Sequence, residues 1–287
     1  MTSALHSARS YLYVPGDQPD RLAKAVDRGA DALIVDLEDS VAVASKAAAR
    51  VITAEWLARR AEHRCQVWIR VNADALADDL RAVVGARIDG IVVPKAEPEL
   101  LREADRLLTE LEHERGLAST VAVIGLVETA RGLLRAAEVA AAPRVLRLGI
   151  GEADLLAELR IQPSESRREL TSLRLQVVVA SAAAGIAAPV APTSTDFRDL
   201  DAFRETTREL MKLGFRARTA VHPAQVPVIN EVFTPDPDEV ARARRIVAAY
   251  EAAVQRGSGV CVDEKGRMVD VAVIRSAREV LDRADRP

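Results

Sequence analysis

Two kinds of hydrophobic pattern alternate along most of the chain. Short apolar runs rich in β-branched residues are followed by longer stretches in which apolar residues recur at a helical spacing, as they do across residues 200–215. Several of these helical stretches end at a glycine, Gly185 among them, as helices often do. The short runs predict strands at Tyr11–Pro15, Ala32–Asp36, Gln66–Asn72, Gly90–Pro94, Val121–Val127, Val145–Gly149, Gly185–Val190 and Ala217–Val221.

The alternation of strands and helices predicts an α/β fold with a parallel sheet. Eight strands, each followed by a helical stretch, favour a closed (β/α)8 TIM barrel. An open doubly wound sheet is the alternative, but no G-x-G-x-x-G motif follows the first strand. We therefore expect a (β/α)8 TIM barrel with a C-terminal helical extension.

The pattern changes after His222. Residues 236–256 read as one long helix, followed by a glycine-rich hinge, a short extended piece and a final helix over Val271–Ala284. We predict a barrel domain over residues 1–233 and a helical segment over residues 234–287. This segment is expected to act as a lid over the barrel mouth or to pack on a neighbouring subunit.

Composition narrows the class of protein. The chain has 287 residues and a net charge of −3, so no basic field suits a nucleic acid. No apolar run reaches the roughly 18 residues that a membrane-spanning helix needs. Its two cysteines are far apart and lack a metal-ligand spacing. We expect a cytoplasmic protein with neither nucleic acid nor membrane as a partner.

In such barrels the catalytic groups follow the C-terminal ends of the strands. A cluster of carboxylates without paired histidines or cysteines suits a hard cation such as Mg²⁺, or Mn²⁺. Each residue also has a structural interpretation: Arg70 could balance nearby acids, and Asp39, Glu128 or Asp154 could cap a helix. The ionisable side chains at these positions are Asp17, Asp36, Glu38, Asp39, Arg70, Lys95, Glu128, Glu152, Asp154, Asp196 and His222.

Several motifs resemble one family in order and spacing. The chain is similar to the citrate lyase beta-subunit-like proteins, which include malyl-CoA and citramalyl-CoA lyases. The resemblance covers nearly the whole chain, and the motifs are specific as a set. They are 9-RSYLYVPGDQPDRLAKAVDRGADALIVDLEDSVAVASKAAAR, 70-RVNA, 90-GIVVPKAE, 126-LVETARGLLRAAEVAAAPR, 214-GFRARTAVHPAQVPVINEVFTP and 266-GRMVDVAVIRSAR.

The resemblance implies a Mg²⁺-dependent enzyme that makes or cleaves a carbon–carbon bond in a 3-hydroxyacyl-CoA. Its partners would be a CoA thioester and a keto acid such as glyoxylate, oxaloacetate or pyruvate, and it would form a homotrimer or a dimer of trimers. Glu128 and Asp154 would hold the metal, and Glu128 would thereby contact the substrate. Arg70 would bind substrate oxygens, and Asp270 would be an acid/base group delivered into a neighbouring subunit's site.

Further roles are weaker expectations from the same resemblance. Arg9, placed at the barrel entrance, and Lys95 would contact CoA or the site carboxylates. The acids that would support the site from behind are Asp36, Glu38 and Asp39.

The chain departs from the family pattern at three positions. Ala153 replaces an acid next to Asp154, and Ala191 and Ser194 stand where relatives have an aspartate and an aromatic residue. The identity of the hydroxyacyl-CoA therefore stays open. Two alternatives also remain, a metal-dependent pyruvate-type aldolase that uses no CoA and a catalytically silent member that serves as a subunit or scaffold.

Overall fold

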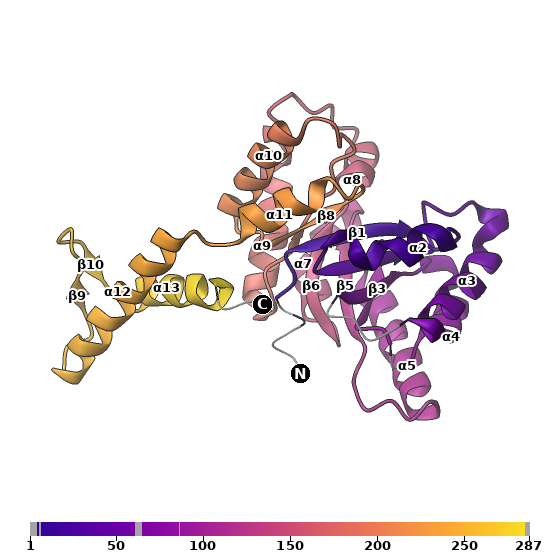
Figure 1. The fold of residues 1–287 in the computed structure, drawn as a ribbon, viewed down its shortest axis with the longest axis horizontal. Helices are drawn as coiled ribbons and strands as arrows, with labels where there is room; N and C mark the ends of the chain where they lie inside the picture. Colours follow the sequence, from indigo (N-terminus) through magenta and orange to yellow (C-terminus); the bar gives the residue numbers. More distant parts are fainter. Residues whose placement is uncertain (1–4, 6, 61–64, 86, 285–287) are drawn as a thin grey trace. The chain divides into compact units, whose positions relative to one another are not determined.

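The barrel is the central feature of the computed structural model, which describes residues 5, 7–60, 65–85 and 87–284 (Figure 1). Within these residues, eight parallel strands close into a ring in sequence order, and β8 pairs with β1. The predicted fold class is confirmed. The strands are β1 Ser10–Pro15, β2 Ala32–Asp36, β3 Gln66–Arg70, β4 Gly90–Val93, β5 Ala122–Val127, β6 Val145–Ile150, β7 Val190–Ala191 and β8 Ala217–Ala220.

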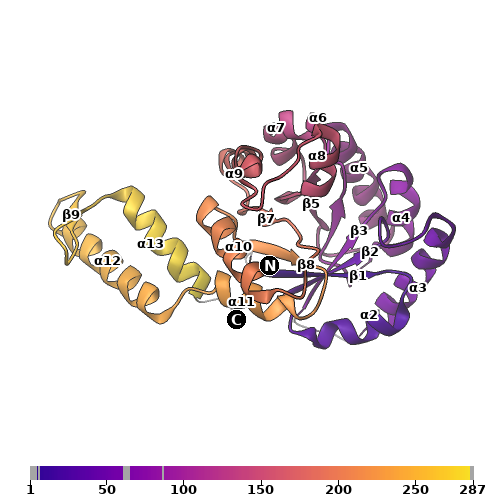
Figure 2. The same cartoon turned by 90° about the horizontal axis from the view of Figure 1, so that it is seen from above.

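Helices cover the outside of the strands, as Figure 2 shows for α3, α4 and α5. Short 3-10 turns add η1 Val26–Arg28, η2 Val43–Ser45, η3 Ala73–Ala75 and η4 Arg168–Leu170. The helices that follow the strands are α2 Pro19–Ala25, α3 Lys46–Arg59, α4 Leu76–Val83, α5 Pro98–Glu114, α6 Ala130–Leu134, α7 Ala136–Ala140, α8 Glu152–Leu159, α9 Thr171–Ala184, α10 Leu200–Leu213 and α11 Gln225–Phe233.

Apolar side chains fill the interior of the barrel. Trp68 is fully buried there and meets the ring of Tyr11 edge-on, with 6.2 Å between the ring centroids. Gly90 on the neighbouring strand makes room for this indole, because a Cβ atom at that position would lie 2.2 Å from Trp68. Packing of these side chains fixes the positions of the strands, so the C-terminal ends of the strands form a rigid rim for the site.

The seventh strand differs from its prediction. The sequence pattern placed it at Gly185–Val190, but the strand covers only Val190–Ala191. Gly185 has φ +68° and closes α9, and the Ile186 N–H donates back to Ser181 of that helix. The Ala187 N–H already donates to Leu146 of β6, but Pro189 has no N–H to donate, so the regular strand begins one residue after it.

The chain divides into two compact units, Met1–Asn230 and Glu231–Pro287. In the second unit, α12 Pro237–Gln255 begins with a capping box between Asp236 and Glu239. A two-stranded antiparallel ribbon of β9 Cys261–Val262 and β10 Met268–Val269 leads into α13 Val271–Ala284. Both predicted helices of this segment are confirmed, and its role as a lid stays a prediction. Across the described residues, no helix combines the length and apolarity that a membrane span requires.

Candidate functional site

The ends of β2 and β3 bring an acid and a base together. Asp36 and Arg70 are paired in register, so both side chains leave the barrel at the same height. The Arg70 Nε and Nη2 atoms each donate to one oxygen of Asp36 at 2.7 Å, and both residues are buried. Burial would raise the pKa of the Asp36 carboxyl, but the bonds from Arg70 hold that pKa below its usual value. This bidentate pair fixes the guanidinium plane.

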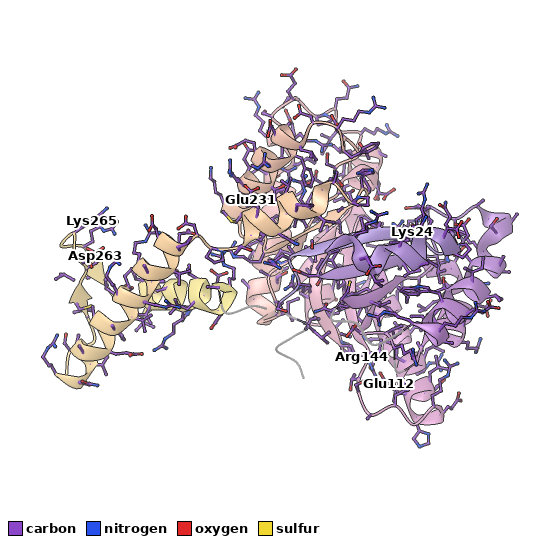
Figure 3. All side chains as sticks on the ribbon, viewed as in Figure 1. Lys24, Glu112, Arg144, Glu231, Asp263 and Lys265 are labelled. Atoms are coloured by element: carbon purple, nitrogen blue, oxygen red, sulfur yellow. The ribbon has the colours of Figure 1, made fainter. Side chains whose placement is uncertain are left out.

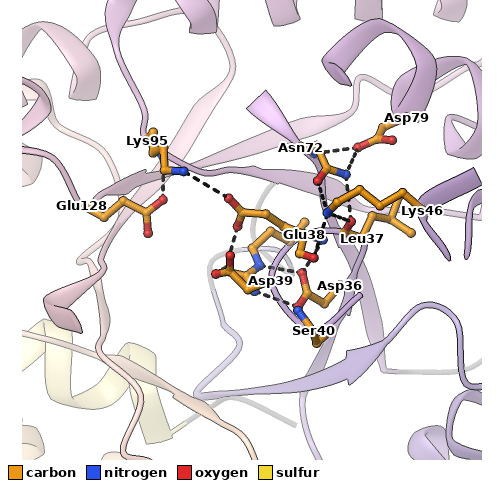
Figure 4. Close-up of polar contacts among 11 residues, drawn as sticks. Asp36, Leu37, Glu38, Asp39, Ser40, Lys46, Asn72, Asp79, Lys95 and Glu128 are labelled. Carbon is orange, nitrogen blue, oxygen red and sulfur yellow. Dashed lines mark hydrogen bonds and ion pairs between the residues drawn. The ribbon is translucent and has the colours of Figure 1, made fainter. Parts of the chain in front are cut away.

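Two further acids after β2 contact the same arginine. Arg70 Nη1 lies 3.0 Å from Glu38 Oε2 and 3.1 Å from Asp39 Oδ2. Asp36 also accepts the backbone N–H groups of Glu38 and Ser40, which holds the turn in place (Figure 4). Burial raises the pKa of Glu38 to about 7, although Arg70 opposes the shift. The three predicted supporting acids, Asp36, Glu38 and Asp39, therefore all contact Arg70, and their role in supporting a catalytic site stays a prediction.

A buried polar network that the sequence analysis missed stands behind this turn. Lys46 Nζ donates to the carbonyl oxygens of Leu37 and Glu38 and to the side chain of Asn72 (Figure 4). Asn72 donates in turn to Asp79 Oδ2 through its backbone, at 2.6 Å, and through its side chain, at 2.8 Å. Asn72 belongs to the R-V-N motif with Arg70, so the sequence contained an indication that it lies near the site. Lys46 and Asp79 lie on helices, and a search limited to the ends of strands does not include them.

Glu128 occupies a different environment after β5. It is 3 % exposed, and its Oε1 accepts the backbone N–H of Lys95 at 2.8 Å. Lys95 adopts φ +47° to present that group, and its Nζ lies 4.0 Å from Glu38 Oε1. Burial raises the pKa of Glu128 to about 8, and the nearby charges of Glu38 and Asp154 add to the shift. A carboxylate held there needs a cation to be stable in its charged form.

The turn after β6 is built around Glu128. A Cβ atom on Gly151 would lie 2.5 Å from the Cβ and Oε2 atoms of Glu128, so only glycine allows this approach. Asp154, in the first turn of α8, is exposed and lines the same cavity. Glu152 instead has a structural role, because Arg174 Nε and Nη2 donate hydrogen bonds of 2.6 and 3.0 Å to its carboxylate.

The donor set fits a hard cation. Among the described residues no group of three or more histidine, cysteine or carboxylate side chains could hold a metal. Mg²⁺ does not need three, because it commonly takes one or two carboxylates and keeps several waters. Glu128 and Asp154 supply such a pair, and the raised pKa of Glu128 marks a carboxylate that lacks a positive partner.

A cavity of about 740 Å³ joins these groups at the C-terminal rim of the barrel. Arg21, Lys24 and Arg28 line one side of it at helical spacing along α2 and η1, and the side chain of Lys24 projects from α2 (Figure 3). All three are exposed, and none forms an ion pair within the described part of the chain. They make this side of the cavity positively charged. Because they follow no strand directly, the pattern of strand ends did not point to them.

One predicted site residue lies away from this rim, and another belongs to the second unit. Arg9 precedes β1, so it lies at the opposite, N-terminal end of the strands, where its Nε and Nη2 donate to Asp31 at 2.8 and 2.9 Å. The expectation that Arg9 reaches the cavity does not agree with this position. Asp270 belongs to the second unit, where its Oδ1 caps α13 by accepting the N–H groups of Ala272 and Val273. Its catalytic role stays a prediction.

Similar proteins are acyl-CoA enzymes. The chain is 31 % identical to the citrate lyase subunit beta of Leuconostoc mesenteroides subsp. cremoris, over 96 % of this chain and 93 % of that protein. It is 34 % identical to the (3S)-malyl-CoA thioesterase of Cereibacter sphaeroides (strain ATCC 17025), over 99 % of this chain and 97 % of that protein.

A solved structure extends the likeness to the fold. The CitE protein of Mycobacterium tuberculosis, in complex with magnesium, acetoacetate and coenzyme A, superposes with a TM-score of 0.76 and 31 % identity. The match covers 97 % of this chain and 99 % of that one. The family model of the HpcH/HpaI aldolases and citrate lyases matches residues 9–223. The chain belongs to the HpcH/HpaI aldolase/citrate lyase family.

Proposed function

We propose that this protein is a Mg²⁺-dependent enzyme that makes or cleaves the carbon–carbon bond of a short 3-hydroxyacyl-CoA. The observation that carries the proposal is the joint placement, in one cavity, of a fixed arginine, a carboxylate pair without an ion-pair partner and three exposed cations. Relatives named as citrate lyase subunits and malyl-CoA thioesterases support the same substrate class.

Glu128 and Asp154 are the residues that would hold the metal. Bound there, Mg²⁺ would act as a Lewis acid on the carbonyl of a keto acid. Glu128 is positioned for this task by the Lys95 N–H, which occupies one lone pair of Oε1. A magnesium-containing relative supports this assignment.

Arg70 would stabilise the negative charge that develops on substrate oxygens. Its guanidinium cannot rotate away, because Asp36 holds two of its nitrogens and the ring of Tyr13 lies 5.0 Å from its Cζ. The remaining nitrogen, Nη1, contacts the buried Glu38 and the exposed Asp39, and a substrate carboxylate or enolate oxygen could displace Asp39. Such a fixed donor needs no reorganisation during the reaction.

The three cations on α2 and η1 would bind the phosphates of CoA. Arg21, Lys24 and Arg28 line the same cavity as Arg70, which would leave the thioester to reach from them toward Arg70. An aldolase that uses no CoA would have no need of this charge. The observation therefore favours the CoA-dependent reaction over the aldolase alternative.

Asp270 would serve as the acid/base group, supplied by the C-terminal unit of a neighbouring subunit in a homotrimer. In the condensing direction its carboxylate would take a proton from the α-carbon of the acyl-CoA. The enolate carbon would then bond to the keto carbon, whose oxygen becomes a hydroxyl after gaining a proton. Cleavage is the same sequence reversed. A carboxylate on a segment that closes over bound CoA would exclude water from the enolate.

The direct test is incubation with Mg²⁺, acetyl-CoA or propionyl-CoA, and glyoxylate or pyruvate, followed by mass spectrometry of the CoA esters. We expect a hydroxyacyl-CoA, and free CoA if thioester hydrolysis follows. Formation of free hydroxy-keto acids without any CoA ester would instead support the aldolase. No turnover of any substrate, in either direction, would support the silent subunit or scaffold.

Subunit exchange tests the role of Asp270. Asp270→Ala and Arg70→Ala chains, each inactive alone, should regain part of the activity when mixed and refolded, because one intact site can form from two different chains. No recovery, with assembly intact by light scattering, would contradict delivery by a neighbour.

A further inference from the structure

The two sides of the cavity differ in charge. In the closed ring, β7 lies four strands from β3 in either direction, so Ala191 at the end of β7 is across the barrel from Arg70. The acids and the arginine that line the cavity come from β2 and β3, from the segments that follow β2 and β5, and from the start of α8. They are Asp36, Asp39, Arg70, Glu128, Glu152 and Asp154.

The opposite wall is neutral. Among the described residues that line it on β7, β8 and the loop after β7, none is ionisable; they are Val190, Ala191, Thr193, Thr195 and Thr219. Val221 and the ionisable His222 follow the end of β8 and also line the cavity. The Thr219 hydroxyl donates to the Ala191 carbonyl oxygen at 3.2 Å, so its proton is already engaged. A substrate group that contacts this wall meets methyl groups and hydroxyl oxygens.

The titratable groups nearest this wall do not supply a buried positive charge to the cavity. Arg218, on β8, is directed toward α10, where it bonds to Thr207 Oγ1 at 2.6 Å and lies over the ring of Phe203. His222 lies exposed at the rim, stacked on Phe197 with 4.8 Å between ring centroids. The exposed cations of α2 and η1 also line the cavity, and the phosphates of CoA would occupy them.

We propose that the keto-acid substrate carries an uncharged alkyl group, as pyruvate and 2-oxobutyrate do, and that the β7–β8 wall receives it. The inference rests on the proposed function for the orientation of the substrate, whose carboxylate and keto oxygen face the metal pair and Arg70. The remaining substituent then points across the barrel to the neutral wall. A second carboxylate, as in oxaloacetate, would lose its hydration there without meeting a cation.

Binding measured without turnover tests this directly. Isothermal titration calorimetry of the full-length protein with Mg²⁺ would compare pyruvate, 2-oxobutyrate and freshly dissolved oxaloacetate. We expect pyruvate and 2-oxobutyrate to bind about tenfold more tightly than oxaloacetate. Equal or tighter binding of oxaloacetate, or no binding of any keto acid, would overturn the inference.

Adding a positive charge to the β7–β8 wall should reverse the order of affinities for pyruvate and oxaloacetate. Thr193→Arg places a cation among the neutral residues, and the exposed Thr195→Lys does so with less risk to folding. Both variants should bind oxaloacetate in preference to pyruvate. Val179→Arg, on the exposed face of α9 outside the cavity, is the matched control and should keep the original order. An unchanged order in both wall variants would contradict the proposal.

The outcome is separable from that of the proposed function. Selective binding of pyruvate without any reaction of an acyl-CoA would leave the alkyl preference standing while refuting the carbon–carbon chemistry. Conversely, efficient formation of a hydroxyacyl-CoA from oxaloacetate, with tight oxaloacetate binding, would support the chemistry and refute the preference.

Discussion

Two parts of the same rim each hold a buried carboxylate, and only one of the two carboxylates is paired with a cation. At the β2–β3 corner, Asp36 is neutralised by two short bonds from Arg70, and the pKa of Asp36 is held low. At the β5–β6 corner, Glu128 accepts one backbone N–H and no side-chain cation among the described residues, and burial raises its pKa to about 8. The carboxylate at the β2–β3 corner is therefore neutralised within the protein. The carboxylate at the β5–β6 corner is not, and a bound cation would stabilise its charged form.

Removing the acid from the first corner should have the largest effect on stability. Asp36→Ala leaves the Arg70 charge buried without its main partner, which typically costs about 3–5 kcal/mol. We expect urea unfolding to show a loss of this size, together with loss of activity. Asp36→Asn, which keeps the shape and one acceptor, is the control and should lose less. A stability equal to that of the wild type would refute the view of this corner as structural.

The equivalent change at the second corner should leave folding intact. Glu128→Gln removes the charge but keeps the side-chain volume, so the metal-free protein should unfold at the same urea concentration or a higher one. Mg²⁺ binding, measured by calorimetry, should become undetectable. If Glu128→Gln binds Mg²⁺ as the wild type does, Glu128 is not a ligand.

The free energy of unfolding of the metal-free protein should depend on pH because the pKa of Glu128 is raised. A carboxyl whose pKa is raised on folding, as for Glu128, binds its proton more tightly in the folded state. The stability that this proton contributes is present below the unfolded pKa of about 4.3 and is lost as the pH rises through about 8. In EDTA, unfolding free energy should therefore fall between these values in the wild type and fall less in Glu128→Gln. A steeper fall in the variant would contradict the raised pKa.

A change at Gly151 tests how the second corner is shaped. Gly151→Ala would push a methyl group against Glu128, because the two side chains would be 2.5 Å apart. We expect Mg²⁺ affinity to fall about tenfold or more, as when groups that position a ligand are altered. Gly85→Ala, where nothing lies within 4 Å of the new atom, is the matched control. Unchanged affinity in Gly151→Ala would mean that Glu128 moves freely.

The smallest effect is expected at the far end of the barrel. Arg9→Ala removes a half-buried ion pair with Asp31, worth about 1 kcal/mol or less. The binding of Mg²⁺, keto acid and CoA should not change, because the pair lies away from the cavity. A weaker affinity for CoA would restore Arg9 to the site and would contradict the position described above.

The sequence predicted the fold and the strand ends well because both depend on local periodicity. The apolar runs placed Asp36, Arg70 and Glu128 at the correct ends of their strands. The same logic failed at β7, where a helix cap at Gly185 and the missing N–H of Pro189 override the apolar pattern. Arg9 precedes β1, so it lies at the end of that strand away from the rim that carries the site, and its contact with CoA stays a prediction.

What the sequence determined by itself was the order of strands and helices and the family motifs, since hydrophobic spacing and residue identity are written along the chain. Only the tertiary structure decided which acids are neutralised and which are not. Arg70 could have balanced any of several carboxylates, and the parallel register of β2 and β3 assigned it to Asp36. Closure of the barrel placed the end of β7 across from Arg70, because the order of strands in a closed ring fixes which strand ends face each other.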